Sequence, residues 1–259
     1  MNIKELLEIE SNSRNCVGEL CFDRPDPLLI AKKYQDEYIS LVCASFAYGK
    51  ASKIVEFLDS LDFSLLDANE DKISKELEGF YYRFQNSEDI KRFFIALRRL
   101  KQIDSLENLF YEKYKLNHDV LEGIDYLIQK IYEYSEGLKS QGFTFLVSNP
   151  FKRDKNGVIK EVGNAPYKRW NMFLRWMVRC DNLDMGLWSR VDKKDLLLPL
   201  DTHTFQVSKN LGLLTRDTYD LKSALLITDK LREFDANDPI KYDFALYRIG
   251  QEKIILTNN

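Results

Sequence analysis

Apolar residues recur three and four positions apart along most of the chain, which is the spacing of amphipathic helices. An early example lies between Asp36 and Gly49, with apolar positions at Ile39, Val42, Cys43, Phe46 and Ala47. Asp36 stands where a helix N-cap belongs, and Gly49 stands where a glycine commonly ends a helix. The pattern therefore predicts a helix between these two residues.

The same spacing predicts further helices along the chain. Ile54, Phe57, Leu58 and Leu61 form one apolar stripe, and residues 71–138 hold at least three more helices. The chain has only 11 glycines and 6 prolines, with few alternating apolar and polar runs, so the sequence predicts an all-α protein. Residues 139–166 are the least helical part. There we expect Phe143 to Val147 to be a short strand or a buried extended piece, and Asn156-Gly157 to be a turn.

Composition narrows the functional classes. A chain of 259 residues suits one large domain or two small ones, and its net charge of −3 restricts any nucleic-acid surface to a local basic patch. The four cysteines are scattered without metal-ligand spacing, which indicates reduced thiols and no metal site. No apolar run reaches the roughly 18 residues of a membrane span, and no signal-peptide pattern is present, so we expect a cytoplasmic protein without membrane contact.

The stretch from Lys168 to Leu213 carries the candidate chemistry. Asn164 can cap a helix in which Lys168 lies close to the N-terminus. The positive end of the helix dipole disfavours a protonated amine there, and a neutral lysine is a nucleophile. A plain surface lysine is the alternative. Arg175 and Arg179 share a face with it and suit either phosphate contacts or a salt-bridge network.

Asp201 follows the apolar run Leu196 to Leu200 and precedes the predicted helix 202–212. It suits a helix N-cap, and a carboxylate there can also stabilise a developing cation. On the last helix, opened by Asp238-Pro239, Asp243 and Tyr247 lie one turn apart. Asp243 lies between Tyr242 and Phe244, so we expect it to be half-buried and paired with Lys168 or an arginine.

These residues resemble a known superfamily. The segment L-D-T-H-T-F-Q-V-S-K-N-L-G-L is similar to the V-D-T-H-x-x-R-V-x-x-R-L-G-L segment of helix-hairpin-helix-GPD DNA glycosylases. The 33 positions between Lys168 and Asp201, and the final D-x-x-x-Y-x-x-G, look most like the archaeal 8-oxoguanine DNA glycosylases. The chain also looks like an uncharacterised bacterial family of this layout. The Gly-rich L-P-G-V-G-x-K hairpin is absent, and V-G-N-A-P-Y-K takes its place.

The resemblance implies roles for individual residues. Lys168 matches the nucleophile and Asp201 the catalytic aspartate; Asp243 matches the acidic residue of the base pocket. Tyr247 stands where the family's tryptophan stacks on the damaged base, and Trp170 or Phe46 could join it. The phosphate contacts are expected from Arg175, Arg179, Lys152 and Arg153.

The resemblance also implies a two-lobed helical fold with a cleft between the lobes. Lobe A would comprise residues 1–65 and 215–259, and lobe B residues 66–214. The expected activity is that of a DNA glycosylase and β-lyase on an oxidised purine in double-stranded DNA, acting as a monomer without cofactor or metal. The alternatives are a non-catalytic protein of the same fold that binds nucleic acid or a protein partner, and a helical scaffold with no nucleic-acid role.

Overall fold

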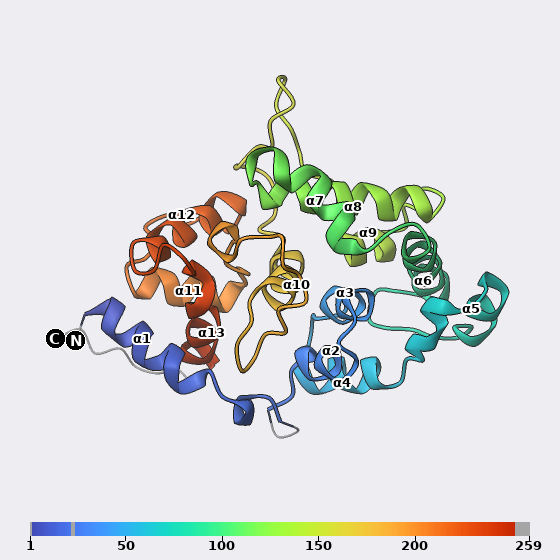
Figure 1. The fold of residues 1–259 in the computed structure, drawn as a ribbon, viewed down its shortest axis with the longest axis horizontal. Coiled ribbons are helices and arrows are strands. Elements are labelled where there is room, and N and C mark those ends of the chain that lie inside the picture. The colour runs from blue at the N-terminus through green and yellow to red at the C-terminus, as the bar shows by residue number, and fades with distance from the viewer. Residues whose placement is uncertain (1, 22–23, 252–259) are drawn as a thin grey trace. The chain divides into compact units, whose positions relative to one another are not determined.

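The computed structural model describes residues 2–21 and 24–251, and these residues form helices and connecting loops (Figure 1). Within this part of the chain there is no strand, only the isolated bridges Tyr82–Gln85, Arg153–Ile159 and Cys180–Met185. The prediction of an all-α fold is therefore confirmed. None of the described helices combines the length and the apolar character needed to span a membrane.

The chain divides into two compact units. The first combines Met1–Cys21 with Lys152–Asn259, and the second is Phe22–Phe151. These boundaries differ from the predicted lobes, because residues 22–65 group with the middle of the chain and residues 152–214 group with the two chain ends. Residues 2–21 and 215–251, both assigned to lobe A, belong to the same unit.

The second unit is built from helices that follow one another closely. They are α2 (Pro27–Tyr34), α3 (Glu37–Ser45), α4 (Ala51–Asp59), η2 (Phe63–Asp67), α5 (Glu70–Glu76), α6 (Ser87–Lys101), α7 (Leu106–Asn117), α8 (Val120–Tyr134) and α9 (Gln141–Val147). Asp36 caps α3 as predicted, because its carboxylate accepts the N–H of Ile39 at 2.9 Å. The helix ends at Ser45, however, four residues before the glycine that was expected to close it.

The segment Phe143 to Val147, predicted as extended, is helical in α9. Ser140 caps this helix, since its hydroxyl oxygen accepts the N–H of Phe143 at 2.9 Å. Its seven residues make barely two turns, too few for the helical period to be visible in the sequence. The cap supplies the local signal that the apolar pattern lacks.

The first unit contains the candidate site. Its elements are α1 (Ile3–Arg14), η1 (Val17–Glu19), α10 (Lys168–Val178), η3 (Lys193–Asp195), α11 (Thr202–Asn210), α12 (Leu221–Arg232), η4 (Pro239–Tyr242) and α13 (Asp243–Gln251). Helix α10 lies in the core, with Trp170, Phe173, Leu174, Trp176 and Met177 all buried. Helices α1 and α11 both pack against α13, so α13 lies between the first helix and the helix that Asp201 caps.

Candidate functional site

Lys168 is the first residue of α10, and the loop before it has an unusual conformation. Tyr167, the N-cap residue, is left-handed, with φ 48° and ψ 43°. The side-chain amide of Asn171 donates to the carbonyl oxygens of Pro166 at 3.0 Å and Tyr167 at 3.3 Å. These bonds hold the chain as it enters the helix and so fix where the lysine side chain starts.

Asn164 does not cap this helix, contrary to the prediction. Its amide oxygen accepts the N–H of Lys152 at 2.8 Å, and its amide nitrogen donates to the carbonyls of Lys152 and Lys160. Asn164 therefore closes the base of the loop 152–160. Tyr167 takes the N-cap position instead. It is buried, and the Asn164 side chain is already bonded to residues 152 and 160.

Asp201 is the N-cap of α11, as predicted. Its Oδ1 accepts the N–H of Thr204 at 2.8 Å, and the residues before it, Leu196, Leu197, Leu198 and Leu200, are buried and anchor its position. The second carboxylate oxygen, Oδ2, lies 3.6 Å from Nζ of Lys168. The Lys168 side chain is 31% exposed and that of Asp201 19% exposed, so the pair is held by the core and still reached by solvent.

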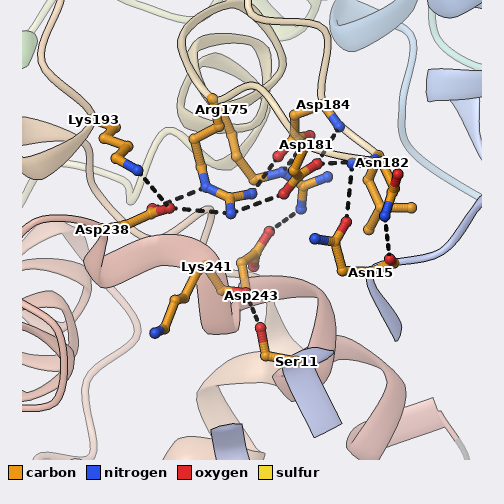
Figure 2. A network of polar contacts seen from close by, with 12 residues as sticks. Ser11, Asn15, Arg175, Asp181, Asn182, Asp184, Lys193, Asp238, Lys241 and Asp243 are labelled. Carbon is orange, nitrogen blue, oxygen red and sulfur yellow. Dashed lines mark hydrogen bonds and ion pairs between the residues drawn. The ribbon is translucent and has the colours of Figure 1, made fainter. Parts of the chain in front are cut away.

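Asp243, the first residue of α13, belongs to the same neighbourhood and is buried. Its partner is Arg175, whose Nη1 donates to Oδ2 of Asp243 (Figure 2). Burial raises the pKa of Asp243, while Arg175 and Lys168 lower it and Asp201 raises it further. Burial is the largest of these effects, and it keeps the pKa of Asp243 above its ordinary value.

Arg175 and Arg179 lie in a buried network of ion pairs, and Figure 2 labels Arg175 together with the acids Asp184, Asp238 and Asp243. Arg175 Nε is 3.1 Å from Asp184, and Arg179 Nε is 2.9 Å from Asp238. Burial lowers the pKa of Arg179, but the Asp184 and Asp238 carboxylates outweigh it and raise this pKa. Neither arginine is placed to contact the phosphates of a nucleic acid, which corrects the role predicted for them.

The three residues expected to stack on a base differ in exposure: one is half-buried and two are buried. Tyr247 is half-buried on α13, with its ring 6.1 Å from that of Phe244. Trp170 is buried beside Phe173. Phe46 belongs to the second unit, where it is fully buried among other rings. A buried ring has no free face for a base, so the stacking roles predicted for Trp170 and Phe46 are corrected, and Tyr247 retains its candidacy.

The basic segment 152–160 is an exposed turn. The N–H of Asp154 donates to the carbonyl of Val158 at 2.8 Å, and Gly157 has φ +81°, so the predicted turn at Asn156-Gly157 is confirmed. Lys152 is exposed, and Arg153 is half-buried with one guanidinium N–H on the carbonyl of Gly157. Both lie on the surface, as a phosphate contact requires.

Sequence reasoning missed three residues that build the site. Asn171 and Tyr167 shape the start of α10, and Asp184 accepts bonds from both buried arginines. The acid-rich turn after α10, D-N-L-D, is the signal that could have indicated a partner for the arginines. The left-handed Tyr167 has no comparable signal, since aromatic residues seldom adopt that conformation.

The chain was compared with known proteins, solved structures and protein families. No curated protein and no solved structure matches the chain. A family model described as "Protein of unknown function (DUF2400)" matches residues 26–252, which is most of the chain. The chain therefore belongs to the DUF2400 family.

Proposed function

We propose that the protein is a DNA glycosylase with β-lyase activity that excises an oxidised purine from double-stranded DNA. One observation carries this proposal: the Lys168 amine and the Asp201 carboxylate, each at the start of its helix, lie 3.6 Å apart and are both accessible to solvent. The resemblance of both segments to helix-hairpin-helix-GPD glycosylases supplies the reaction class.

The proposed reaction uses the amine as the nucleophile. The C1′–N9 bond of the damaged nucleotide breaks, its electron pair leaves with the base, and the base takes up a proton. The Lys168 nitrogen forms a bond to C1′ and loses its proton; opening of the sugar then gives a Schiff base. Loss of a proton from C2′ expels the 3′-phosphate and cuts the strand.

Asp201 has two tasks in this scheme. One oxygen remains bonded to the Thr204 N–H, so the carboxylate does not need to reorient during the reaction. The other oxygen faces the amine, where it accepts the proton that the lysine must lose and stabilises positive charge at C1′. Such preorganised charge costs no rearrangement at the moment of reaction.

Tyr247 and the exposed turn suit substrate binding. Asp243 is buried and bonded to Arg175, whereas Tyr247, one turn further along α13, has a partly exposed ring. Tyr247 therefore suits stacking on an extruded base, and Asp243 suits holding Arg175 in place. Lys152 and Arg153, on the exposed turn, suit contacts to the DNA backbone.

A second candidate is a non-catalytic protein that binds nucleic acid or a protein partner. It is favoured by the segment V-G-N-A-P-Y-K, which replaces the Gly-rich hairpin and is engaged internally through Asn164 and Asn171. The side-chain amides of Asn164 and Asn171 bond to carbonyls of the chain itself, so this segment is held by internal bonds and lacks the Gly-rich turn that grips a phosphate in the superfamily.

Borohydride trapping tests the lead proposal. Duplexes carrying an oxidised purine or an abasic site are incubated with the protein and borohydride, which reduces a Schiff base to a stable amine link. The wild type should form a covalent adduct, and Lys168→Gln should form none. Asp201→Asn should still bind the duplex but lose about a hundredfold or more of base excision.

The matched control is Lys115→Gln, which removes an exposed lysine of α7 without an assigned role and should still trap. Adduct formation by Lys168→Gln would make the nucleophile assignment wrong. If the wild type neither traps nor cleaves across a panel of damaged bases, the non-catalytic candidate replaces the enzyme.

A further inference from the structure

The second unit carries an exposed cluster of aromatic rings around one arginine. We call it the aromatic platform, formed by Tyr48, Tyr81, Arg83, Phe84 and Phe145. Tyr81 is 66% exposed, Phe84 56% and Phe145 42%. Three large rings exposed together on one surface are unusual in a protein with an ordinary core, and such patches commonly mark binding sites.

A tight turn over residues 82–85 holds the platform, with its first and last side chains buried and the two between them exposed. Tyr82 and Gln85 pair through their backbones, with N···O distances of 3.0 and 2.9 Å, and both point inward. The Gln85 amide donates to the carbonyl of Gly142 at 2.8 Å and accepts the hydroxyl of Tyr48. The two residues between them, Arg83 and Phe84, therefore project outward from a fixed base.

Arg83 adopts a backbone conformation that glycine would favour. Its φ is +52°, which costs a residue with a side chain about 1 kcal/mol. A Cβ placed on Gly49 would lie 2.5 Å from Arg83 Nη1, so Gly49 leaves the space in which the guanidinium lies. Backbone strain retained at an exposed turn is typical of functional positions.

The guanidinium of Arg83 contacts aromatic rings. Its guanidinium carbon lies 5.7 Å from the Tyr48 ring centre and 5.6 Å from that of Phe84, and these two rings are nearly parallel, at 3°. Phe145 meets both edge-on. Among residues 2–21 and 24–251, no carboxylate pairs with Arg83. The positive charge is thus presented to solvent beside aromatic faces.

The surrounding segments have a matching charge. Residues 46–55, 79–87 and 139–150 contain no Asp or Glu, and they contain Lys50, Lys53, Arg83 and Lys139. Lys53 is paired with Glu56 at 2.6 Å, and Asp89, which is buried, accepts the hydroxyl of Ser140, so Arg83, Lys50 and Lys139 are the cations that the platform offers. Its complement is a polyanion that also offers flat aromatic groups, and single-stranded nucleic acid has both properties.

We propose that the aromatic platform binds single-stranded nucleic acid by stacking unpaired bases on Phe84, Arg83 and Tyr81, with Lys50 next to the phosphates. This site lies in a different unit from Lys168 and does not depend on the lysine chemistry. It gives the protein a means of engaging unpaired nucleotides that the proposed excision site does not provide.

The test measures binding of a fluorescent oligothymidine by anisotropy, and quenching of 2-aminopurine within the same strand as a readout of stacking. Phe84→Ala should weaken binding roughly 5- to 100-fold and reduce the quenching, as removal of a stacking ring does elsewhere. Arg83→Gly should do likewise without loss of thermal stability, because glycine relieves the strained φ. Leu116→Ala, which removes an apolar side chain that is 65% exposed outside the platform, should leave both readouts unchanged.

Lys168→Gln should bind the oligonucleotide as the wild type does, even if it abolishes adduct trapping, so the two proposals fail separately. The proposal is overturned if the wild type shows no binding at low salt, or if Phe84→Ala and Arg83→Gly bind normally. It is also overturned if polyglutamate competes as well as the oligonucleotide, since that would make the platform a surface for acidic proteins.

Discussion

Replacing Arg175 by methionine separates a structural role of this arginine from a role in phosphate binding. The guanidinium donates to two buried carboxylates, Asp184 and Asp243, and methionine keeps much of the length while removing the charge. Arg179 still faces Asp184, but Asp243 loses the only arginine that bonds to it in the described residues. The variant therefore leaves a buried carboxylate without compensation.

The expected loss is large. Removal of one partner of a buried ion pair costs about 3–5 kcal/mol. For a protein of this size each kcal/mol lowers the melting temperature by roughly 2–4 °C, so Arg175→Met should lower it by roughly 6–20 °C. Thermal unfolding followed by circular dichroism measures this shift. The double variant Arg175→Met with Asp243→Asn should recover part of the loss, because the stranded charge is gone.

Lys152→Met is the matched control, since it removes a positive charge from an exposed position. Its melting temperature should change by less than about 2 °C, because surface substitutions stay near ±0.5 kcal/mol. If the protein binds DNA through this turn, the salt dependence of binding should also become weaker by about one counterion. A melting temperature of Arg175→Met within about 1 °C of wild type, together with a reduced salt dependence, would refute the buried network and restore the phosphate role.

Three further predictions concern other parts of the molecule. Asp201→Asn should keep the α11 cap and its stability, whereas Asp201→Ala should lose about 1 kcal/mol in chemical denaturation, because asparagine can still accept the first-turn N–H. Arg83→Gly should raise stability by up to about 1 kcal/mol in the same assay, since it relieves the left-handed turn. Burial raises the pKa of Glu8, but bonds from Tyr242 and Lys241 outweigh burial, so the net effect is a lowered pKa. The stability that ionised Glu8 gives to the folded state is therefore present above its unfolded pKa of about 4, and it is lost as pH falls through the folded pKa. Hydrogen exchange should accordingly show α1 losing protection below about pH 4, and Glu8→Gln should have less of this pH dependence.

The sequence by itself determined the local features of the site. Asp36 and Asp201 cap their helices through bonds to N–H groups three residues ahead, so a short stretch of sequence contains all the information. Lys168 begins its helix as predicted, and the apolar stripe of α10 is buried as its helical spacing indicated. The all-α class follows from the same periodicity, which depends only on neighbours one or two turns apart.

Only the tertiary structure decided which of these residues meet. Lys168 and Asp201 are 33 positions apart, and their 3.6 Å separation depends on how α10 and the buried leucines before α11 pack. The sequence around Arg175 is compatible with an exposed phosphate contact and with a buried ion pair. The structure decides for the ion pair, because Arg175 is buried and donates to Asp243 at the start of α13. The left-handed conformation of Tyr167 could not be predicted from the sequence either, because it is held by the Asn171 side chain and by the surrounding core. Bonds within one helical turn are encoded where they form, whereas contacts between distant segments exist only once the core has placed those segments together.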